Sequence, residues 1–400
     1  MKKYDYVIVG AGLAGVSAVK GIREEDTEGS ILLVGKEEQI PYNRPPLSKD
    51  LLLGDKKVEE IRIEDEGYYS EQNVELKLGA EITDINPDNH MVTDDKGESY
   101  DYGKLLLATG GYPRKLDIPG GRLEEVNYYR YLDDYESLKG QINRAGSAII
   151  IGGGFIGSEV AAGLNLNDIK VSVVFPEDFL LERVLSKELA AIVQKDYEDR
   201  GVNVINGDKP TRIRKGSEGL EVKTEKGELL QGDIVVVGIG ISPEDELAKR
   251  AGLKVYDGVE VDEHLKTSNP DIYAAGDNTY FPFSALGENT RVEHWDNAKS
   301  QGKLAGQNMA GAGKVYNYVP YFFSDLFNFG FEAVGDLHSK LDTFMDWKEK
   351  GEKGVGYYLS EDGKVRGVLL LGVWGAKGDA RKLVKSDESF SREDLVGKIG

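Results

Sequence analysis

Two glycine-rich loops are the residues of this chain with the clearest chemical use. In each loop the first glycine permits a tight turn, the second lets the backbone approach a pyrophosphate, and the third allows a helix to pack closely on a strand. The helix that follows supplies N–H donors and the positive end of its dipole to the phosphates. Two such loops predict two dinucleotide sites, with electron transfer between the two dinucleotides. The loops are Gly10-Ala11-Gly12-Leu13-Ala14-Gly15 and Gly152-Gly153-Gly154-Phe155-Ile156-Gly157.

Glycine is frequent in this chain, at 50 of 400 residues, so three spaced glycines alone carry little weight. Each loop also follows three apolar residues directly, Val7–Val9 and Ile149–Ile151. That requirement lowers the expected number of chance matches to roughly 0.05 per chain. Two occurrences therefore indicate two binding loops, with an ordinary strand–turn–helix as the alternative for each.

The segments around the loops predict the elements that position them. Residues 4–34 and 145–175 each predict a strand, the loop, a helix and a second strand, the latter at Ile31–Val34 and Val171–Val174. These are two βαβ units, hence two doubly wound sheets. After about residue 315, aromatic residues and alternating strands predict a third, α+β domain. We therefore expect an α/β fold with two Rossmann-like dinucleotide-binding domains and a C-terminal α+β domain.

Composition narrows the chemistry. The chain has no cysteine, which excludes thiolate metal sites and redox-active disulfides, and its four histidines lack metal-ligand spacing, so we expect no metal. The net charge of −20 disfavours nucleic acid. A basic stretch (Lys377, Arg381, Lys382, Lys385) is either a docking patch or an ordinary solvated helix face. Without a membrane-length apolar run, and with a strand starting by Tyr4, we expect a cytoplasmic protein.

Further motifs indicate a family. Pro41-Tyr42-Asn43-Arg44-Pro45-Pro46-Leu47-Ser48-Lys49 resembles the PYxRPPLSK signature of the FAD-dependent, NADH-linked ferredoxin and rubredoxin reductases. Residues 107–111, 267–277 and 321–325 resemble that family's ATG, second FAD and FWSD motifs. Phe175-Pro176-Glu177 and Arg291-Val292-Glu293-His294 are especially similar to apoptosis-inducing factor and its prokaryotic relatives. The resemblance implies the glutathione reductase superfamily fold, with an FAD domain at 1–113 and 240–314, an NAD domain at 114–239 and a C-terminal interface domain at 315–400.

The resemblance also implies FAD contacts. Asp277 follows a buried strand, where a short carboxylate can bond the ribitol hydroxyls, or else caps a helix. The acid that holds the FAD ribose in the family is replaced by Lys36, so Glu37 or Glu38 substitutes or the contact is lost; Glu37 is favoured. Arg44 suits a phosphate or the adenine face, or is a surface arginine. The remaining predicted cofactor contacts are Gly10, Gly12, Leu13, Ala14, Gly15, Ala108, Thr109, Gly110, Gly240, Gly276, Glu293, His294 and Trp295.

Lys49 and Glu159 are the predicted catalytic pair, because in relatives the matching lysine lies beside the flavin and pairs with this acid. Positive charge there stabilises negative charge that develops on hydride arrival; a structural ion pair is the alternative. Phe155 either gates the nicotinamide pocket or is core. Glu177 would accept the NAD 2′-hydroxyl, which favours NADH over NADPH. The second loop's other predicted contacts are Gly152, Gly154, Ile156 and Gly157.

One position departs from the family motif, since the tryptophan of FWSD is Phe323 here. Phenylalanine keeps the apolar cover but loses the indole N–H, which leaves two functions open. In the first, the protein passes electrons from NADH through FAD to a ferredoxin, a rubredoxin or a quinone. In the second, it is an apoptosis-inducing-factor-like slow oxidase whose stable reduced FAD–NAD complex controls dimerisation or partner binding. A homodimer is open in both.

Overall fold

The computed structural model describes residues 2–217 and 219–399, and the chain divides into two compact units. The first unit comprises Met1–Asn43, Glu59–Tyr112 and Ser242–Pro320, and the second comprises Arg44–Val58, Pro113–Ile241 and Tyr321–Gly400. Each unit contains one of the two glycine loops. The boundaries of the three domains expected from the sequence stay a prediction.

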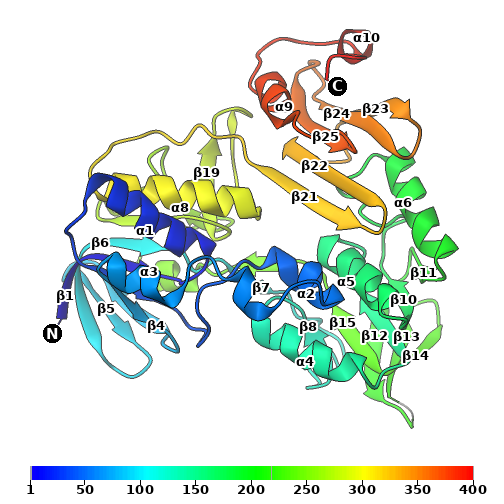
Figure 1. Ribbon diagram of the computed structural model, residues 1–400, viewed down its shortest axis with the longest axis horizontal. Coiled ribbons are helices and arrows are strands. Elements are labelled where there is room, and N and C mark those ends of the chain that lie inside the picture. Colours follow the sequence, from blue (N-terminus) through cyan, green and yellow to red (C-terminus); the bar gives the residue numbers. More distant parts are fainter. Residues whose placement is uncertain (1, 218, 400) are drawn as a thin grey trace. The chain divides into compact units, whose positions relative to one another are not determined.

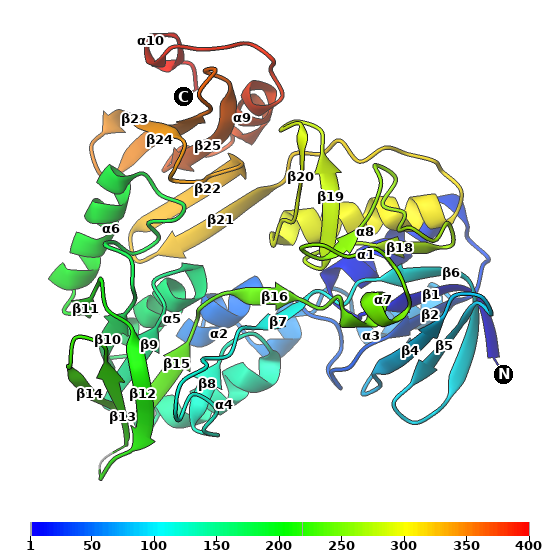
Figure 2. The same cartoon turned by 180° about the vertical axis from the view of Figure 1, so that it is seen from behind.

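The first unit is built on a parallel sheet that begins with the first predicted βαβ unit. Strand β1 (Lys2–Val9) pairs in parallel with β2 (Ile31–Val34) and with β6 (Ser99–Leu107), and β18 (Ile272–Ala274) adds to the far side of β6. All four residues of β2 are buried, as expected for a strand covered on both faces. Figure 2 shows the antiparallel hairpin of β4 (Ile82–Asn86) and β5 (Met91–Asp94) extending this sheet from β6.

Two helices of the first unit lie side by side, α1 (Leu13–Glu25) after the first loop and α8 (Trp295–Met309) (Figure 1). Glycines let their backbones touch. A Cβ on Gly302 would lie 2.2 Å from the carbonyl oxygen of Ala14, and one on Gly306 would lie 2.1 Å from that of Ala18. Any larger residue at either glycine would push the two helices apart, so these glycines set the close distance between α8 and α1.

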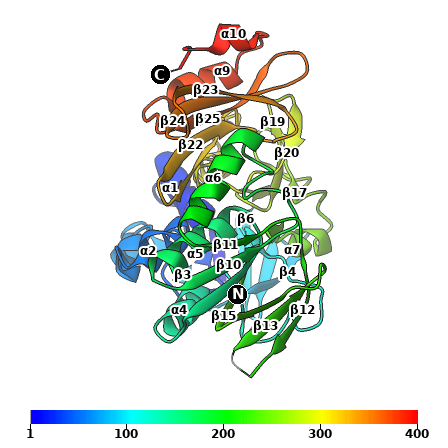
Figure 3. The same ribbon diagram turned by 90° about the vertical axis from the view of Figure 1, so that its right-hand side faces the viewer.

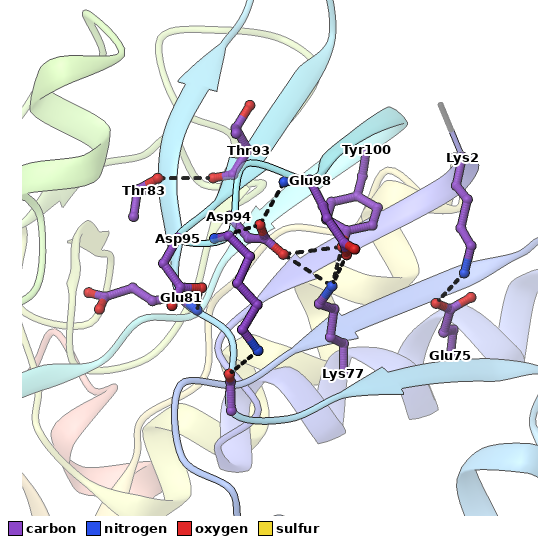
Figure 4. A network of polar contacts seen from close by, with 12 residues as sticks. Lys2, Glu75, Lys77, Glu81, Thr83, Thr93, Asp94, Asp95, Glu98 and Tyr100 are labelled. Atoms are coloured by element: carbon purple, nitrogen blue, oxygen red, sulfur yellow. Dashed lines mark hydrogen bonds and ion pairs between the residues drawn. The ribbon is translucent and has the colours of Figure 1, made fainter.

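A polar network surrounds Lys77, the last residue of β3 (Val74–Lys77), in the first unit (Figure 4). The Lys77 Nζ lies 3.1 Å from Asp94 Oδ2 and also pairs with Glu98. Burial alone would raise the pKa of Asp94, but the hydrogen bonds from Lys77 and from the backbone N–H of Glu98 outweigh it and hold that pKa below its usual value. The buried Asp94 carboxylate therefore serves a structural role, as the ionised partner of Lys77.

The second unit repeats the parallel plan around the second loop. Its sheet has the order β11-β10-β9-β15-β8 with every pair parallel, from β11 (Asn203–Ile205) at one edge to β8 (Val126–Tyr128) at the other. The second loop joins β9 (Ser147–Ile151) to α5 (Phe155–Leu166), and β10 (Lys170–Val174) returns beside β9. Strand β15 (Ile234–Val237) is buried throughout.

A five-stranded antiparallel sheet, in the order β21-β22-β25-β24-β23, follows in the same unit. Its first strand β21 (Tyr321–Leu326) pairs with β22 (Phe329–Gly335), and β25 (Val365–Leu371) pairs with β22 and with β24 (Lys353–Leu359). Figure 3 shows α9 (Lys377–Val384) lying against this sheet, where it contacts β22 and β25. The expectation of alternating strands after about residue 315 is confirmed, and the third domain expected there stays a prediction.

The remaining elements complete the two units. In the first are η2 (Val58–Ile61, which begins at the unit boundary), α3 (Glu66–Glu71), α7 (Glu246–Arg250), β17 (Val259–Glu260), β19 (Thr279–Phe283) and β20 (Glu288–Thr290). In the second are η1 (Pro45–Ser48), α2 (Asp50–Leu53), β8 (Val126–Tyr128), α4 (Leu132–Ile142), α6 (Lys187–Asp199), β11 (Asn203–Ile205), β12 (Pro210–Lys215), β13 (Leu220–Thr224), β14 (Leu229–Gly232), β23 (Asp342–Glu349) and α10 (Arg392–Leu395). The chain passes between the units along β7 (Gly111–Pro113) and β16 (Ile241–Pro243).

Candidate functional site

The first glycine loop has one open position between two crowded ones. Gly10 has φ 116°, and a Cβ there would lie 2.1 Å from the carbonyl oxygen of Ala108. A Cβ on Gly15, in the first turn of α1, would lie 2.0 Å from the carbonyl oxygen of Gly10. Gly12, the N-cap of α1, has nothing within 4 Å of the corresponding position. The outer glycines therefore serve the fold, whereas Gly12 leaves space beside a helix N-terminus for a ligand.

The second loop repeats this geometry in the second unit. Gly152 has φ 115°, and a Cβ on it would lie 2.3 Å from the carbonyl oxygen of Gly238. A Cβ on Gly157 would lie 2.0 Å from the carbonyl oxygen of Gly152, while Gly154, the N-cap of α5, again has nothing within 4 Å. Both loops therefore have crowded first and third glycines and an open middle glycine, which indicates that this arrangement is a property of the motif.

The carboxyl ends of β6 and β18 bring several predicted residues of the first unit together. Thr109 donates from Oγ1 to the carbonyl oxygen of Glu244 at 2.6 Å and accepts from Asn278 Nδ2 at 3.0 Å. Asn278 is fully buried and also donates to the carbonyl oxygen of Leu107. Gly276, with φ 97°, and Asp277 directly precede Asn278. Ala108, Thr109 and Gly110 are thus held against residues 276–278 at one edge of the sheet.

Three predicted cofactor contacts lie where α8 begins: the helix starts at Trp295, His294 is its N-cap, and Glu293 precedes both. Trp295 donates from Nε1 to Asn43 Oδ1 at 2.9 Å. Glu293 accepts from Arg291, whose side chain is 7% exposed and whose guanidinium also faces Asp257. Burial lowers the pKa of His294 to about 4, against the opposing effect of Asp277. The imidazole at the start of α8 is therefore neutral at physiological pH.

Two predicted adenosine-side residues lie in different units. Glu37 accepts from Tyr42 OH at 2.5 Å, while Lys36 is exposed and pairs with Glu81. Arg44, the N-cap of η1 in the second unit, lies with its guanidinium 5.2 Å from the centre of the Tyr131 ring. The ribose role of Glu37 and the phosphate role of Arg44 stay predictions.

Lys49 and Glu159, from distant parts of the chain, form an ion pair in the second unit. The Lys49 Nζ lies 2.5 Å from Glu159 Oε1, and the two side chains are only 11% and 7% exposed. Ser48 and Ser324 each donate from Oγ to the Glu159 carboxylate, at 2.6 and 2.8 Å. Burial, reinforced by this carboxylate, raises the pKa of Tyr197 well above its usual value. The three donors orient Glu159, and Glu159 in turn orients the lysine.

Aromatic residues border this pair. Phe155, the first residue of α5, is half-buried and packs edge-on against Phe322, with ring centres 5.3 Å apart. Phe323, the position of the motif tryptophan, points the other way and is 37% exposed. Lys49 Nζ lies 5.5 Å from the centre of the Phe323 ring. Phe155 is thus part of an aromatic cluster, and its gating role stays a prediction.

At the carboxyl end of β10, Glu177 accepts from Arg183 Nε at 2.8 Å and is 23% exposed. Phe175 lies under the second loop, because a Cβ on Gly153 would meet its ring at 2.7 Å. Gly240, after β15, has φ 92° and open space at its Cβ position. Glu177 therefore lies where a ribose-binding acid is expected. Its ion pair with Arg183 was not predicted from the sequence.

Four polar residues of these sites were missed by reasoning from the sequence. Ser48 and Ser324 lie within the quoted motifs, and their positions beside Lys49 and Phe323 were the available signal. Asn278 follows Asp277 directly. Gln301, fully buried in α8, accepts from the backbone N–H of Gly276 at 2.9 Å, and no local pattern marked it.

The described residues fit two dinucleotides. Two loops leave their middle glycine facing open space at a helix N-terminus, and each lies at the carboxyl edge of a parallel sheet. Among the described residues there is no group of His, Asp and Glu that could hold a metal ion, and no helix long and apolar enough to cross a membrane.

Comparisons with known proteins agree with this geometry. The model of the pyridine nucleotide-disulphide oxidoreductase family matches residues 4–302, and the chain belongs to that family. It is 33% identical to the ferredoxin–NAD(+) reductase component of the anthranilate 1,2-dioxygenase system of Burkholderia cepacia, over 95% of this chain and 93% of that protein. It is also 33% identical to apoptosis-inducing factor 1 of Dictyostelium discoideum, over 99% of this chain and 80% of that protein.

A solved structure resembles the whole chain as well. The covalent putidaredoxin reductase–putidaredoxin complex matches with a TM-score of 0.90 and 32% identity, covering 96% of this chain and 94% of that one. The predicted family resemblance and the predicted α/β fold class are therefore confirmed. The protein is an oxidoreductase of a family named for pyridine nucleotides, although it has no cysteine for disulfide chemistry.

Proposed function

We propose that the protein is an FAD-dependent reductase that oxidises NADH and delivers single electrons to an iron–sulfur or rubredoxin-type acceptor protein. One NADH reduces two one-electron acceptors and yields NAD⁺ and one proton. The observation that carries the proposal is the pair of glycine loops, each open at its middle glycine and crowded at the outer two. A protein with one nucleotide substrate needs only one such loop.

FAD, when bound, supplies the redox chemistry, because it accepts an electron pair as hydride and releases electrons one at a time. This chain's residues provide binding, orientation and charge. The first loop holds the FAD pyrophosphate, with Asp277 on the ribitol and Glu37 on the ribose. Lys49 supplies positive charge where the flavin gains negative charge, and Glu159 keeps Lys49 in place. His294, neutral at physiological pH, adds no charge at the start of α8.

The second loop holds NADH. Glu177 accepts from the 2′-hydroxyl of the adenosine ribose, and its carboxylate repels the 2′-phosphate of NADPH. Arg183 orients Glu177 and partly neutralises it, so we expect a preference for NADH rather than absolute exclusion of NADPH.

We propose that the acceptor approaches the face of β21 that exposes Phe323. Tyr321 and Asp325 share this face by strand alternation, and Trp374, 62% exposed, packs over Gly330 opposite Asp325. Exposed aromatic side chains are typical of protein interfaces.

The basic stretch contributes less positive charge to this face than its sequence suggests. Lys377 is paired with Glu332, and Lys382 with Asp379. Its steering of an acidic partner is therefore modest.

A second candidate function rests on Phe323. Where the family motif has tryptophan, this smaller ring favours slow delivery of electrons to an acceptor. In this alternative the protein is an apoptosis-inducing-factor-like slow oxidase whose long-lived reduced FAD–NAD complex controls dimerisation or partner binding.

Anaerobic stopped-flow reduction by NADH separates the two. Rapid bleaching of the flavin band, followed by rapid reoxidation with ferredoxin or rubredoxin, supports the reductase. A persistent long-wavelength band, slow reoxidation by every protein and quinone acceptor, and a change of oligomeric state with NADH support the alternative. A protein that binds no FAD refutes both. We place the activity in the cytoplasm, which cell fractionation with an antibody tests directly.

A further inference from the structure

Glu37, the predicted ribose acid of the first unit, is held by a tyrosine. Tyr42 donates from its hydroxyl to Glu37 Oε2 at 2.5 Å. A phenol that donates to a carboxylate makes a short, charge-assisted hydrogen bond, which is one of the stronger kinds in proteins. Reasoning from the sequence left Glu38 as an alternative acid and gave Tyr42 no role.

The backbone of Tyr42 is fixed on both sides. The N–H of Asn43 donates to the carbonyl oxygen of Ile61 at 2.8 Å, and the N–H of Ile63 donates to that of Pro41 at 2.9 Å. The Tyr42 side chain is 6% exposed. A tyrosine has only two side-chain torsions, so a fixed backbone and a buried ring leave its hydroxyl little freedom. The hydroxyl is therefore a rigid anchor for the carboxylate that it contacts.

Packing brings Glu37 close to the open glycine of the first loop. Gly35, the first residue after β2, touches this loop, because a Cβ on it would lie 2.7 Å from the Cβ of Ala11. Ala11 directly precedes Gly12, which faces open space, and Glu37 lies two residues after Gly35. Glu37 is half-buried at the carboxyl end of a parallel strand, where a ribose acid is expected.

Glu38, the alternative acid, is placed differently. It is exposed, and its side chain lies against Gly79, where a Cβ would be 3.2 Å from the Glu38 Cγ. The N–H of Gly79 also donates to the carbonyl oxygen of Glu37 at 3.1 Å. Glu37 is therefore held through its backbone and through its carboxylate, and it is the better candidate of the two.

We propose that Tyr42 is a positioning residue for the dinucleotide on the first loop, because it holds the Glu37 carboxylate in the orientation that accepts from the adenosine ribose hydroxyls. A carboxylate has about four acceptor positions, of which a phenol uses one, so it can accept from the phenol and from both ribose hydroxyls together. Ordering this side chain before the dinucleotide binds removes a cost of binding equal to about two- to tenfold in affinity. The inference rests on the proposed function, which places FAD on this loop.

The substitution Tyr42→Phe tests this, because it removes the hydroxyl and keeps the ring. The dissociation constant of FAD, measured by quenching of flavin fluorescence on the apoprotein, should rise by about two- to tenfold. In a Glu37→Ala background the same substitution should leave the dissociation constant unchanged, because the hydroxyl then has no carboxylate to hold. This dependence on Glu37 separates positioning from a general effect on the fold.

Tyr6→Phe is the matched control. Tyr6 is another buried tyrosine of the first unit, 8% exposed, and its hydroxyl donates to Asp26 Oδ2 at 2.8 Å. Asp26 is the C-cap of α1, at the opposite end of that helix from Gly12. Tyr6→Phe and Tyr42→Phe should lower the melting temperature of the apoprotein by similar amounts, whereas Tyr6→Phe should leave the affinity for FAD unchanged.

The outcomes are distinguishable. If Tyr42→Phe binds FAD as tightly as Tyr6→Phe does, or if it weakens binding equally with and without Glu37, the inference is overturned while the proposed function stands. If Tyr42→Phe does not fold, Glu37→Gln and Glu38→Gln replace it. Unchanged FAD affinity of Glu37→Gln, or a loss of affinity in Glu38→Gln instead, then overturns the inference. If the unsubstituted apoprotein binds no FAD, the proposed function fails, and the inference fails with it.

Discussion

The two open glycines allow each nucleotide site to be tested separately. Adding one methyl group at Gly12 should affect only the first site, and adding one at Gly154 should affect only the second. Gly12 has φ −90° and ψ −168°, and Gly154 has φ −83° and ψ −172°, extended values that alanine adopts without strain. A Cβ at either position meets no protein atom within 4 Å. We therefore predict that Gly12→Ala and Gly154→Ala fold normally and lose one nucleotide each.

The magnitudes follow from the backbone and from the lost contacts. Replacing glycine by alanine reduces the entropy of the unfolded chain, worth about 0.4–1 kcal/mol, and loses a similar amount of N-capping preference. The apoprotein should therefore change in stability by less than about 1 kcal/mol. The methyl group occupies the space of the pyrophosphate and displaces it from backbone N–H donors. Hydrogen bonds to charged groups contribute about 1.5–3 kcal/mol each, so losing two weakens binding by about 100-fold or more.

The assay uses colour and nucleotide affinity. Gly12→Ala should purify without flavin absorbance and melt at the temperature of the unsubstituted apoprotein. Gly154→Ala should keep its FAD but show a dissociation constant for NADH raised by about 100-fold or more in anaerobic titration. Gly10→Ala is the contrasting control, because φ 116° and the 2.1 Å approach to Ala108 predict a loss of folded protein. If Gly12→Ala retains FAD, or if Gly154→Ala loses FAD instead of NADH, the assignment of the loops is refuted.

Three further outcomes are expected. Lys49→Met should cost the apoprotein about 3 kcal/mol of stability, because it leaves the buried Glu159 carboxylate without its cation. Adding Glu159→Gln should restore part of this stability in thermal unfolding. An unchanged melting temperature in the single variant argues against the pair. The lowered pKa of His294 means that its protonation opposes folding, so the protein should lose at most about 3 kcal/mol of stability through this group as pH falls from about 6.5 to 4. His294→Gln should remove this loss. Equal acid-unfolding profiles of the two proteins would contradict the lowered pKa. Glu177→Ala should release Arg183 and raise the ratio of kcat/KM for NADPH to that for NADH by about tenfold or more in a steady-state assay, and an unchanged ratio would remove Glu177 from the nucleotide site.

The sequence predicted what depends on local pattern. The strands expected at Ile31–Val34 and Val171–Val174 lie in runs with β-branched residues, and the structure has them at Ile31–Val34 and Lys170–Val174. The helix expected after the first loop, within residues 4–34, forms from Leu13 to Glu25. Lys49 and Glu159 were paired only because a resemblance joined two motifs, since nothing in their spacing brings them together. The structure adds that they touch.

What the sequence could not supply was the orientation of polar groups over long separations. The sequence does not distinguish Gln301 from other helix glutamines, whereas in the structure its Oε1 accepts from the backbone N–H of Gly276. The ion pair of Arg183 with Glu177 depends on the loop that follows β10. In both cases the signal is a three-dimensional approach that no local periodicity records.

Strand β21 of the second unit carries both the proposed acceptor face and a residue that contacts the Lys49–Glu159 pair. Because side chains alternate along a strand, Phe323 faces outward and Ser324 faces inward, where it donates to Glu159. A one-residue slip of β21 would exchange the two faces, removing a donor from the Lys49–Glu159 pair and burying the aromatic ring. The register that exposes the proposed acceptor face is therefore the register that completes the charged pair. Phenylalanine at the position of the motif tryptophan keeps this register, because Ser324 still donates to Glu159. We therefore expect it to change the delivery of electrons to the acceptor and to leave the Lys49–Glu159 pair intact.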